Sequence, residues 1–317
     1  MSNADVPGQK RRRVDQDQPT EADPQPAVGA IDPNAAADPE PQAPTNAQLS
    51  SSAAGAARNH APLSRLEPSI FNSKPSDDIL KYVSEFLAKY IKRPHVEIEA
   101  KIGLMIDNRT NQRIYLPVRT ETVLADDRNI RFASDMTMDQ HAHYNRLLNN
   151  LTLERGSIIR YTHLREVDSF YYAPSKNVRV TTNEGSSEIK AIVIKKKVAT
   201  IDVYCPAYPL DYRISVSEEL PAPKPQPNQE LVFRRKKDRL SYAHQIVQVD
   251  LTQVRKLSSN GNETDLTHEL ELEIRKPQDL QKELHKHETQ QPNLYRDHID
   301  ILLNSVRILA RRGIGAR

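Results

Sequence analysis

Cysteine is almost absent from this chain of 317 residues, in which Cys205 is the single thiol. One cysteine cannot form an internal disulfide, and its scarcity favours a reducing, intracellular setting. The chain also has no uninterrupted apolar run long enough to span a bilayer, and its polar N-terminus lacks the apolar segment of a signal peptide. These absences predict a soluble intracellular protein with no membrane partner.

Glycine and aromatic residues are scarce as well. The nine glycines of the chain form no Gly-rich phosphate-binding loop. The absence of Trp and the presence of only five Phe argue against a surface that binds single-stranded RNA by stacking its bases on aromatic rings. The 45 basic and 42 acidic residues nearly cancel, so a preference for a charged partner has to come from the arrangement of the charges.

The first part of the chain lacks aromatic residues altogether. Residues 1–62 hold nine of the 22 prolines and no Phe, Trp or Tyr. Such a segment buries too little apolar surface to offset the entropy that it loses on ordering. We therefore expect residues 1–63 to be a disordered Pro/Ala-rich tail and residues 64–317 to fold. The basic run Lys-Arg-Arg-Arg at 10–13 is either a nuclear import signal or a solvated charge run.

Helical periodicity is found in three segments of the folded part. In residues 76–92, apolar residues recur at three- and four-residue steps, with Ser76 as the expected N-cap and Pro94 just beyond the end. Residues 139–150 and 293–311 predict two further helices. We expect all three to pack against the rest of the fold rather than to carry chemistry.

Alternation of apolar and polar residues, the pattern of β-strands, fills most of the chain between these helices. The stretch 221–228 has proline at every second position, so it is predicted to be a surface loop. The candidate strands are 95–106, 113–124, 128–134, 157–171, 176–183, 188–205, 211–220, 230–242, 245–256 and 267–276.

Charge is concentrated on one face of several of these strands; in 95–106, for example, Glu97 and Glu99 lie opposite Ile98 and Ala100. A charged face is most simply the solvated outside of a sheet. Clustered glutamates repel one another, however, a complementary basic strand exists, and the amphipathic helices need an apolar sheet surface to cover. The predicted fold is therefore mainly β (α+β), a closed antiparallel β-barrel tunnel with a charged interior and a few helices packed outside.

Glutamates of two strands would meet inside such a barrel. Glu-x-Glu on a strand places two carboxylates on one face, about 7 Å apart. Crowded carboxylates protonate or separate unless a cation holds them. Oxygen ligands suit a hard divalent ion such as Mg²⁺ or Mn²⁺, and there is no His/Cys cluster with the spacing of a zinc site. The residues concerned are Glu97, Glu99, Glu269, Glu271 and Glu273.

A row of cations is predicted on the facing wall, where Arg235, Lys237 and Arg239 alternate along one strand. Arginine binds phosphate oxygens through two parallel hydrogen bonds. A metal on one wall and guanidinium groups on the other are the parts needed to transfer a phosphoryl group to water. Further cations of this wall would be Arg179, Arg213 and one of Lys195, Lys196 and Lys197.

Two charged motifs near the ends of the folded part carry a family resemblance. They read Glu-Ile-Glu-Ala-Lys-Ile-Gly at 97–103 and Glu-Leu-Glu-Leu-Glu at 269–273. In their order and spacing with the other segments, they resemble the triphosphate tunnel metalloenzymes, and among these the fungal messenger RNA triphosphatases (the beta subunit of the mRNA capping enzyme), over about residues 68–311. The other similar segments are 177–180, 211–219, 235–242, 250–254 and 304–309.

The resemblance implies a metal-dependent RNA 5′-triphosphatase, with residues 64–317 as its catalytic domain. Such an enzyme uses Mg²⁺ or Mn²⁺ to remove the γ-phosphate of nascent messenger RNA, which is the first step of cap formation. The resemblance also implies location in the nucleus, a guanylyltransferase subunit as partner, a homodimer, and contact with the transcription machinery.

The same resemblance implies roles for individual residues. Glu97, Glu99 and Glu273 would ligate the metal. The γ-phosphate would be bound by cations, and Glu219 would orient the attacking water. The implied phosphate-binding residues are Arg179, Lys237 and Arg239, and the implied supporting residues are Glu269, Glu271, Arg235, Lys196 and Asp250.

Two placements and two rival functions stay open. Glu218 competes with Glu219, which is preferred because it shares a strand face with Arg213, and imperfect alternation leaves any of residues 195–197 able to face inward. The first rival is a tunnel-fold hydrolase of inorganic tripolyphosphate, thiamine triphosphate or nucleoside triphosphates. The second is a non-catalytic RNA-binding barrel, which the scarcity of aromatic residues disfavours.

Overall fold

The computed structural model describes residues 66–125 and 128–315. The chain divides between Leu66 and Glu67 into two units, and the fold below is that of the second, Glu67–Arg317. The predicted tail and its basic run lie outside the described residues, so the boundary between residues 63 and 64 stays a prediction. Within the described part, no helix has the length and apolar character needed to cross a membrane.

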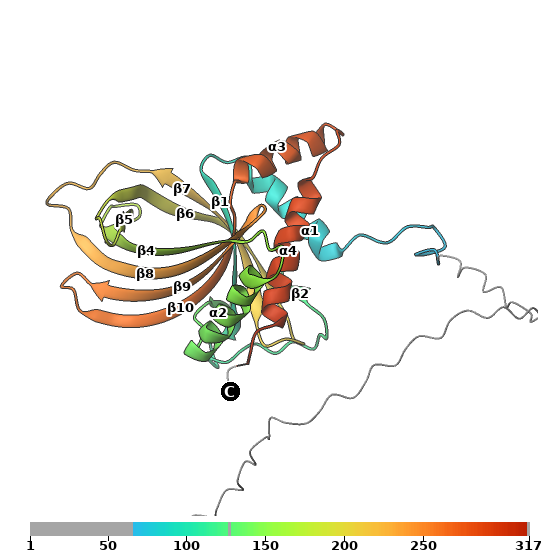
Figure 1. Ribbon diagram of the computed structural model, residues 1–317, viewed down its shortest axis with the longest axis horizontal. Helices are drawn as coiled ribbons and strands as arrows, with labels where there is room; N and C mark the ends of the chain where they lie inside the picture. Colours follow the sequence, from blue (N-terminus) through green and yellow to red (C-terminus); the bar gives the residue numbers. More distant parts are fainter. Residues whose placement is uncertain (1–65, 126–127, 316–317) are drawn as a thin grey trace, which may run out of the picture. The chain divides into compact units, whose positions relative to one another are not determined.

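In the described part of the chain, eight antiparallel strands close into a barrel (Figure 1). The order around the ring is β1-β7-β6-β5-β4-β8-β9-β10, and pairing of β10 with β1 closes it. The short strands β2 (Thr122–Val123) and β3 (Ile130–Ala133) extend β6 and β1 outside the ring. The ring strands are β1 (Val96–Asp107), β4 (Arg160–Tyr171), β5 (Val178–Asn183), β6 (Ile189–Tyr204), β7 (Asp211–Pro221), β8 (Leu231–His244), β9 (Val247–Ser258) and β10 (Glu263–Ile274).

The helices lie together on one side of the barrel (Figure 1). They are α1 (Asp78–Tyr90), α2 (Met138–Leu153), α3 (Pro277–Glu288) and α4 (Tyr295–Arg311). The Asp77 carboxylate caps α1 by accepting hydrogen bonds from the Ile79 and Leu80 backbone N–H groups. A capping box between Thr137 and Gln140 starts α2.

The apolar core lies between the helices and the outer face of the barrel. Leu302 and Val306 of α4 are completely buried, as are Ile98 of β1 and Leu270 of β10. Each fully buried aliphatic side chain of this kind contributes about 1.5–3 kcal/mol relative to an exposed one. The predicted fold class is confirmed: an antiparallel barrel turns its apolar face outward to helices and its charged face inward.

A close approach of β3 to β1 requires the glycine at position 103. A Cβ atom there would lie 2.9 Å from the Phe132 ring and closer still to the Ala133 carbonyl. Any larger side chain would therefore push β3 away. Gly103 allows the ring of Phe132 to lie directly against β1.

Three expectations about secondary structure are corrected. In the predicted strand 113–124, β2 is the one strand that forms, because Pro117 cannot donate to a ladder and the alternating apolar residues there instead pack on a small cluster around Met105. Helix α3 was not predicted because its polar sequence holds few apolar residues besides Leu280 and Leu284. The N-cap of α1 is Asp77 rather than Ser76.

Candidate active site

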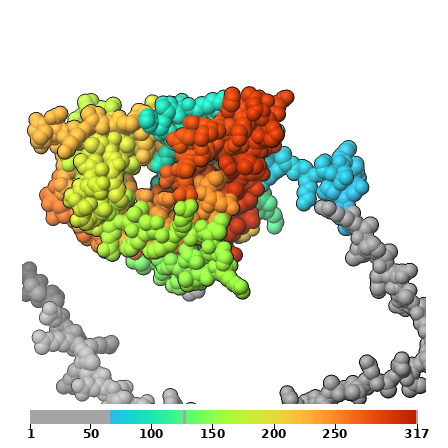
Figure 2. Space-filling model, turned by 45° about the horizontal axis from the view of Figure 1, so that its top comes forward, coloured from blue at the N-terminus to red at the C-terminus, as the bar shows by residue number. Residues whose placement is uncertain are grey.

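The interior of the barrel holds a cavity of about 420 Å³ whose walls are almost entirely charged. Figure 2 shows the molecule hollowed between its yellow-green and its orange-red segments. Because inward-facing residues alternate along every strand, each strand sends a ladder of polar side chains into this space. Fifteen charged residues line it: Glu97, Glu99, Lys101, Glu166, Arg179, Lys190, Lys195, Glu219, Arg235, Lys237, Arg239, Asp250, Glu269, Glu271 and Glu273.

Carboxylates gather where β1 and β10 pair. The strand register places Glu99 directly opposite Glu273 and Lys101 opposite Glu271. Glu271 forms an ion pair with Lys101, and although burial acts in the opposite direction, this ammonium holds the pKa of Glu271 below its usual range. Glu273 has no ion pair within the described part of the chain, and burial together with the negative charges of Glu97 and Asp250 raises its pKa to about 8.

A lysine ammonium already lies among these acids. Lys195 Nζ forms an ion pair with Glu97 and lies 3.2 Å from Glu99 Oε2. Burial, only partly opposed by Lys195, raises the pKa of Glu97. A positive charge is therefore required at this point, and the all-oxygen donor set fits a hard divalent cation. As the side chains stand, no three Asp, Glu, His or Cys groups of the described residues are close enough together to ligate one.

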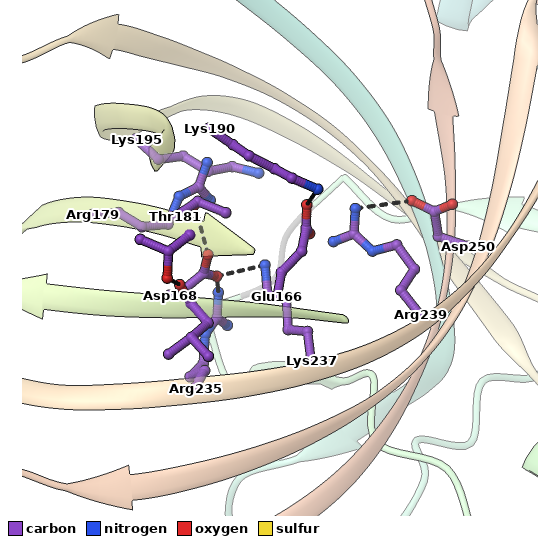
Figure 3. Close-up of polar contacts among 12 residues, drawn as sticks. Glu166, Asp168, Arg179, Thr181, Lys190, Lys195, Arg235, Lys237, Arg239 and Asp250 are labelled. Atoms are coloured by element: carbon purple, nitrogen blue, oxygen red, sulfur yellow. Dashed lines mark hydrogen bonds and ion pairs between the residues drawn. The ribbon is translucent and has the colours of Figure 1, made fainter. Parts of the chain in front are cut away.

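The opposite wall is organised around Asp168, which is completely buried (Figure 3). Lys237 Nζ lies 2.5 Å from its carboxylate, Arg235 Nη2 donates to it at 3.2 Å, and Thr181 Oγ1 donates at 2.7 Å. Burial alone would raise the pKa of Asp168, but the Lys237 ammonium and these hydrogen bonds outweigh it and lower the pKa to about 2. The carboxylate is therefore ionised and fixes the direction of two cations.

Two further ion pairs lie on the same wall of the cavity (Figure 3). Arg239 Nη1 lies 3.3 Å from Asp250 Oδ2, and Lys190 Nζ lies 3.2 Å from Glu166 Oε1. Sequence reasoning missed Glu166, Asp168 and Lys190. Glu166 and Asp168 are two residues apart on one strand, as in the Glu-x-Glu patterns. The other face of that strand is also charged, so the sequence did not show the contrast between a charged and an apolar face that identified β1 and β10.

The structure separates the two candidates for the water-orienting carboxylate. Glu219 lines the cavity, where it accepts a hydrogen bond from Arg179 Nη2 at 2.7 Å. Glu218 points to the other face of β7 and pairs with Arg93 at 3.1 Å. Placement therefore favours Glu219, while its role stays a prediction.

Of the three consecutive lysines, Lys195 rather than Lys196 reaches the acids of the cavity. Lys196 is exposed and does not line the cavity. Lys197 faces the same interior further along the barrel. A β-bulge between Lys197 and Ala199 breaks the alternation of β6, and that irregularity is why the sequence pattern did not identify the inward residue. The expectation that Lys196 lies in the site is therefore corrected: Lys195 lies there instead.

Three arginines of the interior have N–H donors that no described residue accepts. Arg179, Arg235 and Arg239 each have a buried Nε–H without a hydrogen-bond partner in the described part of the chain. Leaving such a donor unsatisfied costs about 1–3 kcal/mol, so three of them in one enclosed space point to an absent acceptor. An anion with several oxygen atoms supplies what these three donors lack.

Comparisons with known proteins agree with this geometry. A family profile described as "mRNA capping enzyme, beta chain" matches residues 73–313. The chain is 37% identical over 262 residues to the mRNA-capping enzyme subunit beta of Schizosaccharomyces pombe, an alignment that covers 78% of this chain and 85% of that protein. It is 31% identical over 226 residues to the subunit of the same name from Cryptococcus neoformans, covering 66% of this chain and 56% of that protein. The solved structure of the S. pombe Pct1 RNA triphosphatase superposes with a TM-score of 0.74 at 34% identity, over 80% of this chain and all of that one.

Proposed function

This chain belongs to the family of mRNA capping enzyme beta chains, and on that premise we propose that it is an RNA 5′-triphosphatase. The reaction adds water to the γ-phosphorus of triphosphate-ended RNA and breaks the bond between the γ-phosphorus and the β–γ bridging oxygen. Its products are inorganic phosphate and a diphosphate-ended RNA, which is the substrate for cap addition. The observation that carries the proposal is the set of three unsatisfied arginine donors facing a wall of carboxylates.

The cationic wall binds and orients the phosphates. Lys237 and Arg235 are held by Asp168, and Arg239 is held by Asp250. Their fixed positions place positive charge where the γ-phosphate oxygens become more negative during transfer, and no reorganisation is needed at that moment. Arg179 joins them when it turns from Glu219 to the phosphate.

Glu219 then has a free carboxylate for the water. Its oxygen, released from Arg179, accepts a hydrogen bond from the attacking water and aligns that water with the γ-phosphorus. Asp250 and Glu271 hold the cations rather than the substrate, since Asp250 pairs with Arg239 and Glu271 with Lys101. Glu269 lines the cavity, and burial followed by the neighbouring Glu271 charge raises its pKa.

A divalent cation, for which Glu97, Glu99 and Glu273 are the proposed ligands, supplies neutralisation of γ-phosphate charge when bound. These three carboxylates come from β1 and β10. Burial, and after it the repulsion of neighbouring carboxylates, raises the pKa of Glu97 and of Glu273, and such a cation would favour the ionised form of both. Both Mg²⁺ and Mn²⁺ suit this oxygen donor set.

The first test is release of phosphate from γ-³²P-labelled triphosphate-ended RNA, with Mg²⁺, with Mn²⁺ and with EDTA. Release in the presence of either metal and none with EDTA is the expected result. Glu99→Ala should lower the rate by at least roughly 10²-fold, as for the loss of other electrostatic stabilisers. Glu67→Ala, outside the barrel, is the control that should retain full activity.

Inorganic tripolyphosphate, thiamine triphosphate and ATP belong in the same assay. If the folded protein hydrolyses one of these but no triphosphate-ended RNA, it is a different tunnel hydrolase. If it binds RNA but hydrolyses none of these compounds with any divalent ion, it is a binding barrel.

We infer the cellular setting from the relatives. The name of the S. pombe relative is that of a capping-enzyme subunit, so the proposed partner is an mRNA guanylyltransferase subunit and the proposed location is the nucleus. The S. pombe Pct1 RNA triphosphatase has been solved in complex with the Spt5 CTD, and that structure superposes with a TM-score of 0.73 at 34% identity, over 79% of this chain and all of that one. This motivates the proposal of contact with the transcription machinery. A homodimer, which size-exclusion chromatography with light scattering would detect, is proposed on the family resemblance alone.

A further inference from the structure

Beyond the acidic and basic walls, the barrel interior opens into a second cavity of about 550 Å³. The two cavities share Glu99, Lys101, Arg179, Lys195 and Arg235 on their walls, so they adjoin one another. The second is lined on one side by Phe132 of β3 and on the other by Phe170 and Phe233. We call this end the aromatic mouth, defined by Phe132, Phe170, Phe233, Lys176, Lys197 and Arg213.

The aromatic mouth holds three of the five phenylalanines of the chain. Phe170 and Phe233 are opposite each other on β4 and β8, with ring centroids 4.3 Å apart and planes 16° from parallel. Neither belongs to the hydrophobic clusters of the described structure. Apolar burial therefore does not explain why this chain, so poor in phenylalanine, keeps a stacked pair inside a charged tunnel.

Cations surround the rings. Arg235 lies 5.1 Å from the centroid of Phe170, Lys256 lies 5.5 Å from that of Phe233, and Arg213 lies 5.0 Å from that of Phe132. Lys176 and Lys197 form no ion pair within the described part of the chain. Aromatic rings interleaved with cations are the composition of a groove that binds single-stranded nucleic acid.

Charge distinguishes the two parts of the tunnel. Seven cationic and eight acidic side chains line the inner cavity, whereas seven cationic side chains and a single acid line the cavity at the mouth. The inner part can therefore hold a metal together with phosphate, but the mouth favours a polyanion without a metal. A sugar-phosphate chain satisfies that preference.

Spacing along β8 connects the two parts. Phe233, Arg235 and Lys237 follow one another at two-residue steps on the inward face, about 7 Å per step. Arg235 belongs to both cavities and contacts both Asp168 and the Phe170 ring. A triphosphate whose γ end lies at Lys237 therefore places its first nucleoside near Phe233.

We propose that the stacked Phe170–Phe233 pair is a nucleoside-binding subsite, which holds the first base of triphosphate-ended RNA while the free lysines of the aromatic mouth bind the following phosphates. The inference rests on the proposed function and adds to it a reason to expect tighter binding of RNA than of a bare triphosphate. Stacking tolerates any base because every base has an aromatic face, so the subsite selects for a nucleoside rather than for a sequence.

The test compares triphosphate-ended RNA with inorganic tripolyphosphate, which has no base. Phe233→Ala and Phe170→Ala should each raise KM for RNA roughly ten-fold or more, the size measured for losing one base–aromatic stack, and should leave kinetics on tripolyphosphate unchanged. Phe233→Leu, which keeps apolar volume but removes the ring, should behave like Phe233→Ala. Tyr115→Ala, at a ring 87% exposed outside the barrel, is the matched aromatic control and should change neither substrate.

A binding measurement without turnover gives a second readout. RNA carrying 2-aminopurine as its first base, added in EDTA, should lose fluorescence on binding to the native protein and lose less on binding to Phe233→Ala. The same probe at the tenth base should show no difference between the two proteins.

Each outcome separates the subsite from the proposed function. If the native protein hydrolyses RNA and the Phe variants, with unchanged melting temperatures, keep its KM, the subsite is refuted while the triphosphatase stands. Equal losses on RNA and tripolyphosphate would mean that the rings support the phosphate site and bind no base. A native protein that hydrolyses tripolyphosphate but no RNA refutes the proposed function itself.

Discussion

The two faces of β1 differ in nearly every physical property, although they alternate residue by residue. Ile98 and Ala100 are completely buried under the helices, while Glu97 and Glu99 project into a charged cavity. The outer face contributes burial and almost no charge; the inner face contributes charge held in ion pairs. A shift of one residue in strand register would exchange them, so the same alternation that encodes the fold also encodes the site.

This contrast separates stability from chemistry. Changes on the outer face should lower the free energy of unfolding and leave each folded molecule active. Changes on the inner face should lower activity and leave most of the stability. The predictions below test that division from the largest expected effect to the smallest.

Leu302→Ala tests the outer face. Leu302 on α4 is completely buried against the barrel, so its truncation should lower the free energy of unfolding by about 2–5 kcal/mol, as for other buried leucines. Urea denaturation measures this loss. Ile308→Ala on the same helix, at a side chain 49% exposed, should cost far less. A large loss of kcat in folded Leu302→Ala would break the division.

Lowering the pH should destabilise the protein by protonating a histidine that is buried on the outer face of the barrel. His141 of α2 is buried against His268 of β10, and burial, then the His268 ring, lower its pKa from 6.5 to about 4 although Asp238 acts in the opposite direction. Between pH 6.5 and pH 4, His141 is therefore protonated in the unfolded chain but largely neutral in the folded protein. The contribution of neutral His141 to stability is complete above pH 6.5 and should be lost, by up to about 3 kcal/mol, as the pH drops to 4. Glu273, whose pKa is raised to about 8, acts in the opposite direction over this range, so the comparison with a variant isolates the His141 effect.

Unfolding curves between pH 7 and pH 4 measure this effect. His141→Gln, which cannot gain a proton, should show a smaller decrease over the same window. Equal slopes for the two proteins would mean that another group titrates there.

Lys237→Ala tests the inner face. Its loss should lower kcat/KM by at least roughly 10²-fold, equivalent to about 2.7 kcal/mol of transition-state stabilisation. The barrel should remain folded because Arg235 and Thr181 still bind Asp168. Lys236→Ala, the neighbouring residue on the outward face with a side chain 46% exposed, is the matched control and should keep normal kinetics. Circular dichroism verifies that both variants are folded.

The consecutive lysines of β6 give the sharpest comparison. Lys195→Ala should lower kcat/KM roughly ten-fold, because the ion pairs that hold Glu97 and Glu99 in position are lost. Lys196→Ala should have no measurable effect. If Lys196→Ala instead lowered kcat/KM more than Lys195→Ala, Lys196 rather than Lys195 would face the interior of the barrel in the active protein.

The alternation of charged and apolar residues was sufficient to predict the barrel and its inside-out character. It failed where apolar residues alternate without forming a strand and where a helix buries too few apolar residues to show a period. Residues 113–121 alternate because they dock on Met105 and Tyr204, without a ladder partner beyond the bridge of Arg113 to Ile106. Helix α3 forms on the burial of Leu280 and Leu284, too few positions to show a period.

The site was predictable to the extent that its residues share a strand face. Glu-x-Glu and Arg-x-Lys-x-Arg marked two walls in advance. The cavity contains every proposed residue except Lys196 and Arg213, and Arg213 lines the second cavity instead. Asp168 was not predictable, since its importance comes from two cations 67 and 69 residues away, and such pairings depend on strand order. Phe170 and Phe233 are similarly unremarkable until β4 and β8 bring them together.

Pairing of β1 with β10 also determines when the protein can begin to work. The Lys101–Glu271 contact joins residues 170 positions apart, so the ribosome has to release β10 before the ring closes. Closing so long a loop carries a large entropy penalty, and folds dominated by distant pairings form slowly. Until that step, β1 is not paired with β10, and the glutamates of β1 do not lie beside the glutamates of β10. A nascent or truncated chain that lacks residues 263–274 is therefore expected to be inert, and activity is expected only after β10 has left the ribosome.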